Sequence, residues 1–143
     1  MKWNLLVVLV IGALLGANAN DETDKELEKL QGTWILVSVE TKGQALPKDK
    51  IVQNTLVISG QRFIPMSGGK VLREATFKID VTKNPKWIDQ ISQDKDGKSA
   101  VRPGLYELNG ETLRLAFDRE RPMELKTTTD SNLNITVYER EKK

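Results

Sequence analysis

The chain has 143 residues, with 22 lysines and arginines against 20 aspartates and glutamates, and it contains neither histidine nor cysteine. The balanced charge gives no support for a nucleic-acid or anionic-membrane partner. The two missing residue types exclude a Ser-His-Asp triad, a cysteine nucleophile, a metal site built on histidine or cysteine, and a disulfide framework. We therefore expect a domain stabilised by its core alone, without metal or cofactor, and not an enzyme.

The first residues have the pattern of a secretory signal peptide. Lys2 precedes an uncharged apolar run from Leu5 to Leu15, and an Ala-x-Ala match follows at 17–19. A membrane anchor is the alternative, but the run is well short of the roughly 20 residues that a spanning helix needs. No cysteine follows the run, which excludes lipoprotein processing. We expect a signal peptide over 1–19, export to the periplasm or the extracellular space, and one mature domain over 20–143.

The mature part begins with a charged segment, residues 21–30, in which Leu27 and Leu30 are spaced as on one helix face. Asp24 is a suitable N-cap, so we predict a short helix against one end of the domain. From Gln31 onward, short apolar or alternating runs are separated by turn residues, which indicates strands. The eight predicted strands are 33–41, 55–59, 61–65, 74–82, 86–92, 104–108, 111–118 and 133–139.

The strongest strand signal is strict alternation of apolar and polar residues, as in 74–82. In the last predicted strand, Leu133, Ile135 and Val137 share one face. Short strands at near-regular spacing, without long helices, predict an all-β fold. Tight connections favour one eight-stranded antiparallel up-and-down barrel, because closure removes exposed sheet edges.

Two glycine-containing segments predict tight hairpin turns. Asn109-Gly110 is the strongest such signal, and we expect a type I′ turn with positive φ at both residues. Ser67-Gly68-Gly69-Lys70 lacks the strand-to-helix context of a phosphate-binding loop, so it predicts a hairpin turn instead.

The start of the first strand, Gly32-Thr33-Trp34, resembles the opening motif of the lipocalins. The resemblance implies that Trp34 closes one end of the barrel and that an arginine near the end of the last strand, here Arg140, packs over it. A guanidinium over an indole face contributes roughly 0.5–2 kcal/mol. Gly32, Trp34 and Arg140 are thus the residues expected to close the barrel.

A wider resemblance spans the mature chain. In order, its segments are similar to an uncharacterised lipocalin-like domain family best known from planctomycete bacteria, which implies an exported bacterial β-barrel domain with no established activity. The segments that carry the resemblance are Leu30-Gln31-Gly32-Thr33-Trp34, Leu56-Val57-Ile58-Ser59-Gly60 with Phe63, Thr76-Phe77-Lys78-Ile79-Asp80, 82–89, 104–113 and Arg121-Pro122.

Acidic residues offer two candidate sites, and a structural interpretation is favoured for both. Asp80 and Asp89 could form a glycosidase-like pair if their carboxyls lay about 5–10 Å apart in a cleft. Otherwise they are ordinary strand residues. Asp94-Lys95-Asp96-Gly97 resembles part of a calcium loop, but Gly97 at loop position 6 puts Pro103 at position 12, where an acid is required. We interpret this segment as a polar turn.

The barrel interior is the remaining candidate site. An eight-stranded barrel is either filled by side chains or just wide enough for one small ligand. Alternation places several aromatic residues inward, and Arg121 either lies at the mouth, restrained by Pro122, or bonds loop carbonyls or Glu124. The candidate ligand-binding residues are Phe63, Phe77, Trp87, Tyr106, Phe117 and Arg121.

Two non-enzymatic functions follow from these alternatives. The first is a binding domain that holds a small apolar or amphipathic molecule at the barrel mouth, a step that rests on analogy between folds. The second is a cell-envelope interaction or structural module with a packed core and an apolar outer patch at Ile35, Val37 and Val39. An enzyme that uses carboxylates or lysine is disfavoured.

Overall fold

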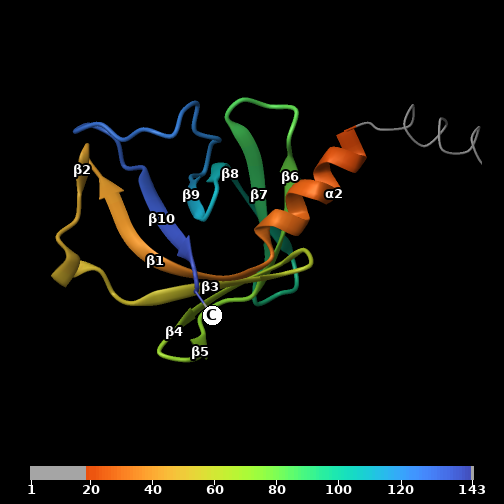
Figure 1. Ribbon diagram of the computed structural model, residues 1–143, viewed down its shortest axis with the longest axis horizontal. Helices are drawn as coiled ribbons and strands as arrows, with labels where there is room; N and C mark the ends of the chain where they lie inside the picture. Colours follow the sequence, from red (N-terminus) through yellow and green to blue (C-terminus); the bar gives the residue numbers. More distant parts are fainter. Residues whose placement is uncertain (1–18, 143) are drawn as a thin grey trace, which may run out of the picture.

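The computed structural model describes residues 19–142, so the predicted signal peptide lies almost entirely outside the described residues. Helix α2 is followed by eight principal strands that close into a barrel, with two short strands and one 3-10 turn between them (Figure 1). The elements are α2 (Ala19–Leu30), β1 (Gly32–Thr41), β2 (Gln44–Ala45), η1 (Lys48–Lys50), β3 (Asn54–Ser59), β4 (Arg62–Ser67), β5 (Lys70–Val71), β6 (Ala75–Asp80), β7 (Lys86–Gln93), β8 (Ser99–Asn109), β9 (Thr112–Phe117) and β10 (Asn134–Arg140).

The predicted up-and-down barrel is confirmed. Apart from the short β2 and β5, each strand pairs antiparallel with the next along the chain. β10 then returns to pair with β1, where Trp34 lies opposite Arg140. β2 and β5 pair only with β1 and β4, as small hairpin extensions. Closure leaves none of the eight principal strands as a free sheet edge, which protects the domain from edge-to-edge association.

Strand boundaries agree with the predictions to within two residues, except at the start of β8. This strand begins at Ser99 rather than Gly104, and residues 99–103 pair with the second half of β7. The extra segment shows no alternation of apolar and polar residues and ends in Pro103, which cannot donate a backbone hydrogen bond, so its sequence does not resemble a strand. Pairing with a long neighbouring strand overrides that weak local preference.

The hairpin between β8 and β9 has a different turn from the one predicted. Asn109 pairs with Thr112, so the central residues are Gly110 and Glu111. Of these two only Gly110 has a positive φ, +61°, which corresponds to a type II′ turn. The Ser67–Lys70 hairpin is confirmed, and both of its central glycines have positive φ, as a type I′ turn requires.

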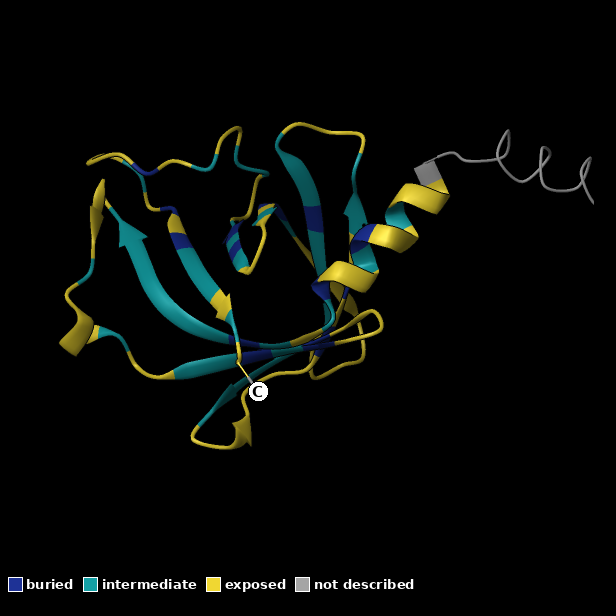
Figure 2. Cartoon of the chain, in the orientation of Figure 1, coloured by how far each residue is buried: buried dark blue, intermediate teal, exposed yellow. Residues whose placement is uncertain are grey.

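Helix α2 covers one end of the barrel, as predicted, but Asp24 is not its N-cap because the helix already begins at Ala19. Leu30 is buried in the main core, and Leu27 packs against it. Glu26 is also buried, although the rest of the helix surface is largely exposed (Figure 2). The helix thus contributes one narrow face to the barrel end.

The barrel interior is filled by its own side chains. Eleven buried residues from α2 and seven of the eight principal strands form one contiguous core: Leu30, Trp34, Leu56, Ile58, Phe63, Ala75, Phe77, Ile88, Tyr106, Leu113 and Leu115. Trp34, Leu56 and Leu113 are completely shielded from solvent, and the buried residues lie along the strands where they face the barrel centre (Figure 2). The barrel is therefore packed through its centre, and the strands enclose side chains where a larger barrel would hold a ligand.

A second, smaller cluster lies on the outer face of β9 and β10. Leu115 points into the main core, so its neighbour Ala116 projects from the opposite face of the strand. Ala116 clusters with Leu133 and Ile135, with Val137 and Leu125 packed against them. The shared face predicted for the last strand is confirmed, but it is the outer face. We call residues 118–133 the strap, because they supply Leu125 and Leu133 to this cluster.

Candidate functional site

The three residues expected to close the barrel lie together at the end covered by α2. Trp34 is fully buried, and its Nε1 donates a hydrogen bond of 2.9 Å to the Leu30 carbonyl. The Arg140 guanidinium carbon lies 4.3 Å from the Trp34 ring centroid, and Nη1 donates to the Gln31 carbonyl at 2.6 Å. A Cβ on Gly32 would lie 3.2 Å from that nitrogen, and the φ of Gly32 is +122°. Glycine is thus required by the backbone conformation, and a side chain here would also crowd Arg140.

The three candidate phenylalanines contact one another inside the barrel. Phe63 meets Phe77 edge-on with ring centroids 6.3 Å apart, and it meets Phe117 edge-on at 5.9 Å. Edge-to-face pairs of this kind add about 0.5–1.5 kcal/mol beyond the burial of area. Since each ring occupies the space beside the next, these residues act as core.

Trp87 and Arg121 lie on the outer face of the barrel, which corrects the expectation that Trp87 points inward. Ile88 belongs to the core, so its neighbour Trp87 projects outward. The Arg121 guanidinium stacks 4.0 Å from the Trp87 ring centroid and bonds Asp89 at 2.7 Å. Its Nη1 also donates to the Gly104 carbonyl at 2.9 Å. Arg121 is therefore an anchor that holds the strap against β7 and β8.

The last candidate, Tyr106, belongs to a polar network at the covered end of the barrel. Its hydroxyl donates to Oε2 of Glu26 at 2.9 Å, and Lys86 bonds the same oxygen. Glu26 is only 6% exposed, whereas the Lys86 side chain is 39% exposed. A buried carboxylate is stabilised only when it is paired and hydrogen-bonded, so Lys86 and Tyr106 together compensate the charge of Glu26.

Three hollows surround Lys86 at this end. The first, about 220 Å³, lies between α2 and Val81, and the second, about 380 Å³, extends toward Gly110 and Arg140. The third, about 310 Å³, has the most varied lining, and we call it the Tyr106 hollow. It is lined by Asn84, Pro85, Lys86, Tyr106, Glu107, Leu108, Arg114 and Leu125. Of the six candidate ligand-binding residues, only Tyr106 lines any of these three hollows.

The candidate acid pair does not form a catalytic arrangement in the described residues. In the pairing of β6 with β7, Asp80 lies opposite Trp87, and Lys78 lies opposite Asp89. Hydrogen bonds from the hydroxyl and backbone N–H of Thr82 lower the pKa of Asp80, the opposite of what a general acid needs. Asp89 is paired with Arg121. Both carboxylates therefore serve local structure.

The acidic turn after β7 is organised by hydrogen bonds within the chain. Oδ1 of Asp94 accepts bonds of 2.9 Å from the backbone N–H groups of both Asp96 and Lys98. Over residues 19–142, no three acidic side chains come close enough together to hold a metal ion. In the same range, no helix is both long and apolar enough to cross a membrane.

Both tyrosines of the chain lend themselves to a pH test. Burial raises the pKa of Tyr106, helped by the adjacent Glu26 carboxylate, and burial also raises the pKa of Tyr138. The folded state therefore retains phenol protons that the unfolded state loses near pH 10, so stability falls as pH rises past about 10. We expect phenolate absorbance to appear only together with loss of the far-ultraviolet circular dichroism of the sheet. A phenolate signal that precedes unfolding would contradict the burial of both rings.

Comparison with known protein families, with characterised proteins and with solved structures finds no match in any of the three.

The Tyr106 hollow includes residues that sequence reasoning missed, above all Lys86, Arg114 and Leu125. No motif joins them, because they come from two different strands and from the strap. A signal was present for Glu26, which lies four residues before the buried Leu30 and therefore on the same helix face. An acid at that position indicates a buried partner.

Proposed function

We propose that this protein is an exported, non-enzymatic module of the lipocalin-like kind that binds a small amphipathic molecule on the outside of a solid barrel. The signal-peptide pattern of the first residues supports the export, and the closed eight-stranded antiparallel barrel supports the lipocalin-like kind. The sequence placed the ligand at the barrel mouth, among aromatic residues expected to point inward, but several of those residues fill the core. The binding position is therefore moved to the Tyr106 hollow.

The observation that carries this proposal is the mixed lining of the Tyr106 hollow. Pro85, Leu108 and Leu125 supply apolar surface, while Lys86 and Arg114 supply hydrogen-bond donors. Its volume of about 310 Å³ lies at the lower end of the range of about 300–1,000 Å³ that is typical of small-ligand pockets. Apolar walls with a few convergent polar groups suit a small amphipath.

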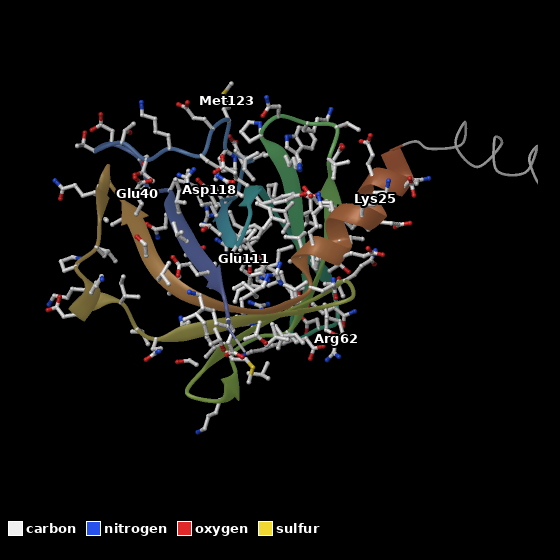
Figure 3. The ribbon with its side chains drawn as sticks, in the orientation of Figure 1. Lys25, Glu40, Arg62, Glu111, Asp118 and Met123 are labelled. Carbon is white, nitrogen blue, oxygen red and sulfur yellow. The ribbon has the colours of Figure 1, made fainter. Side chains whose placement is uncertain are left out.

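A second candidate function, a protein-interaction module, is favoured by exposed apolar side chains. Ile35, Val37 and Val39 are only partly exposed and are not among the exposed large hydrophobic residues of the described part of the chain. The exposed large hydrophobic residues lie elsewhere, and Met123, in the strap, is 92% exposed and points away from the barrel (Figure 3). The others are Val52, Val71, Leu72 and Val101. Such residues mark interaction sites when they are contiguous.

Native mass spectrometry of the protein, purified without detergent from the cells that produce it, tests the two functions. We expect a monomer with an added small mass that is lost on denaturation. A bare monomer would overturn small-molecule binding as the function. A bare dimer would favour the interaction module, and a Met123→Ser variant that becomes monomeric would assign the strap to the interface.

A further inference from the structure

We infer that the Tyr106 hollow selects a small amphipath with a carboxylate head, which Arg114 and Lys86 bind while the aliphatic part lies on Leu108 and Leu125. This inference rests on the proposed function and names the chemical class of its ligand. It is argued from the donors, the walls and the charges of the hollow.

Two cationic side chains, Arg114 and Lys86, bring hydrogen-bond donors to this hollow. Arg114 has five guanidinium protons, but the structure gives it only a 3.3 Å bond from Nη2 to the Leu125 carbonyl and a 3.5 Å ion pair between Nη1 and Glu107. Lys86 has three ammonium protons and bonds one oxygen, on Glu26. Both side chains therefore retain donors for an incoming group that only accepts hydrogen bonds.

The acids near the hollow are already engaged. Glu26 is occupied by Lys86 and Tyr106 and does not line the hollow. Glu107 does line it, but its side chain is 52% exposed and its contact with Arg114 is a long one. Such a half-exposed pair contributes little energy, so a ligand carboxylate can replace Glu107 on the guanidinium. A carboxylate also matches the fork of an arginine in a two-point contact.

The apolar walls are held in place by the fold. Leu108 packs against the main core, and Leu125 packs against the outer cluster beneath the strap. The Leu125 carbonyl is in turn bonded by Arg114, so the cation and the apolar wall are joined directly. Preformed walls reduce the ordering cost of binding, which favours the binding of a short aliphatic chain.

Three probes that share one aliphatic chain test the inference: octanoate, octanol and octylamine, each titrated into the full-length protein by calorimetry and by ¹H–¹⁵N spectra. We expect octanoate to bind most tightly and octylamine least tightly, with amide shifts at residues 84, 86, 106–108 and 125, since Pro85 has no amide proton. The Arg114→Gln substitution should weaken the binding of octanoate about tenfold, which is the scale of one charge-assisted hydrogen bond, and leave the affinity for octanol unchanged. Arg62→Gln is the matched control, because Arg62 is half-exposed in a surface pair with Glu74 and should change nothing.

Each other outcome overturns the inference. Equal binding of all three probes, or tighter binding of octylamine, would show that the hollow does not select a carboxylate. Normal octanoate binding by the Arg114→Gln variant would show that Arg114 does not bind the carboxylate. If no probe binds while the native protein carries a small mass, the ligand class is wrong and the proposed function stands. If no probe binds and the native protein is bare, both fail.

Discussion

Replacing Trp34 by alanine should lower the free energy of unfolding by about 3–5 kcal/mol, the range for truncating a large buried aromatic residue. Trp34 is fully buried, so the change leaves a cavity at the centre of the closed barrel end. It also removes the hydrogen bond to the Leu30 carbonyl and the ring on which Arg140 stacks. We expect the urea midpoint to fall by roughly 2 M in far-ultraviolet circular dichroism.

Two further substitutions separate the loss of the buried ring from the loss of the hydrogen bond and from the loss of a tryptophan in general. Trp34→Phe keeps an aromatic ring and loses the N–H donor, so it should cost only about 1–2 kcal/mol. Trp87→Ala is the matched control, because Trp87 lies partly exposed on the outer face between Arg121 and Lys83. Its loss should cost under about 2 kcal/mol. A midpoint for Trp34→Ala no lower than that for Trp87→Ala would refute the closing role of Trp34.

Replacing Lys86 by methionine should destabilise the protein by about 2–4 kcal/mol. The change leaves the Glu26 carboxylate buried with Tyr106 as its remaining hydrogen-bond donor among those the structure records. Removing one partner of a fully buried pair costs about 3–5 kcal/mol. The value here is lower because the Lys86 side chain is 39% exposed and water reaches its position.

The double variant Lys86→Met/Glu26→Gln provides the decisive comparison. The side-chain amide that replaces the Glu26 carboxylate is neutral and still accepts a hydrogen bond from Tyr106, so no uncompensated charge remains. We expect the double variant to be more stable than Lys86→Met alone, although it carries one more substitution, in the same urea titrations. Additive losses from the two single changes would mean that the charges are not coupled.

Most of the barrel was predictable because its signals are local. Alternation in 74–82 and 111–118 and the glycine turns at 68–69 and 110 each depend on a few consecutive residues. The N-terminal half of β8 was missed for the same reason. Its strand form depends on pairing with residues 89–93 of β7 across the connecting turn, and not on its own sequence, which does not alternate and contains Pro103.

The candidate site was predicted less well, since alternation shows that two faces differ but not which one is inside. The last strand illustrates this, because its apolar face is covered by the strap and lies outside the barrel. Trp87 and Ile88 are both apolar neighbours, so the pattern alone could not decide which of them enters the core. Only the closed barrel settles that choice.

The sequence by itself determined an all-β meander of eight strands, a short helix at one end, and the exclusion of chemistry that needs histidine or cysteine. The tertiary structure decided that the core is full, that Arg121 anchors the strap, and that Lys86, Tyr106, Arg114 and Leu125 line one hollow. The physical reason is the separation along the chain of the residues that interact. Strand periodicity and turns are set by neighbouring residues, whereas burial, ion pairing and hollows arise where segments far apart in the chain meet.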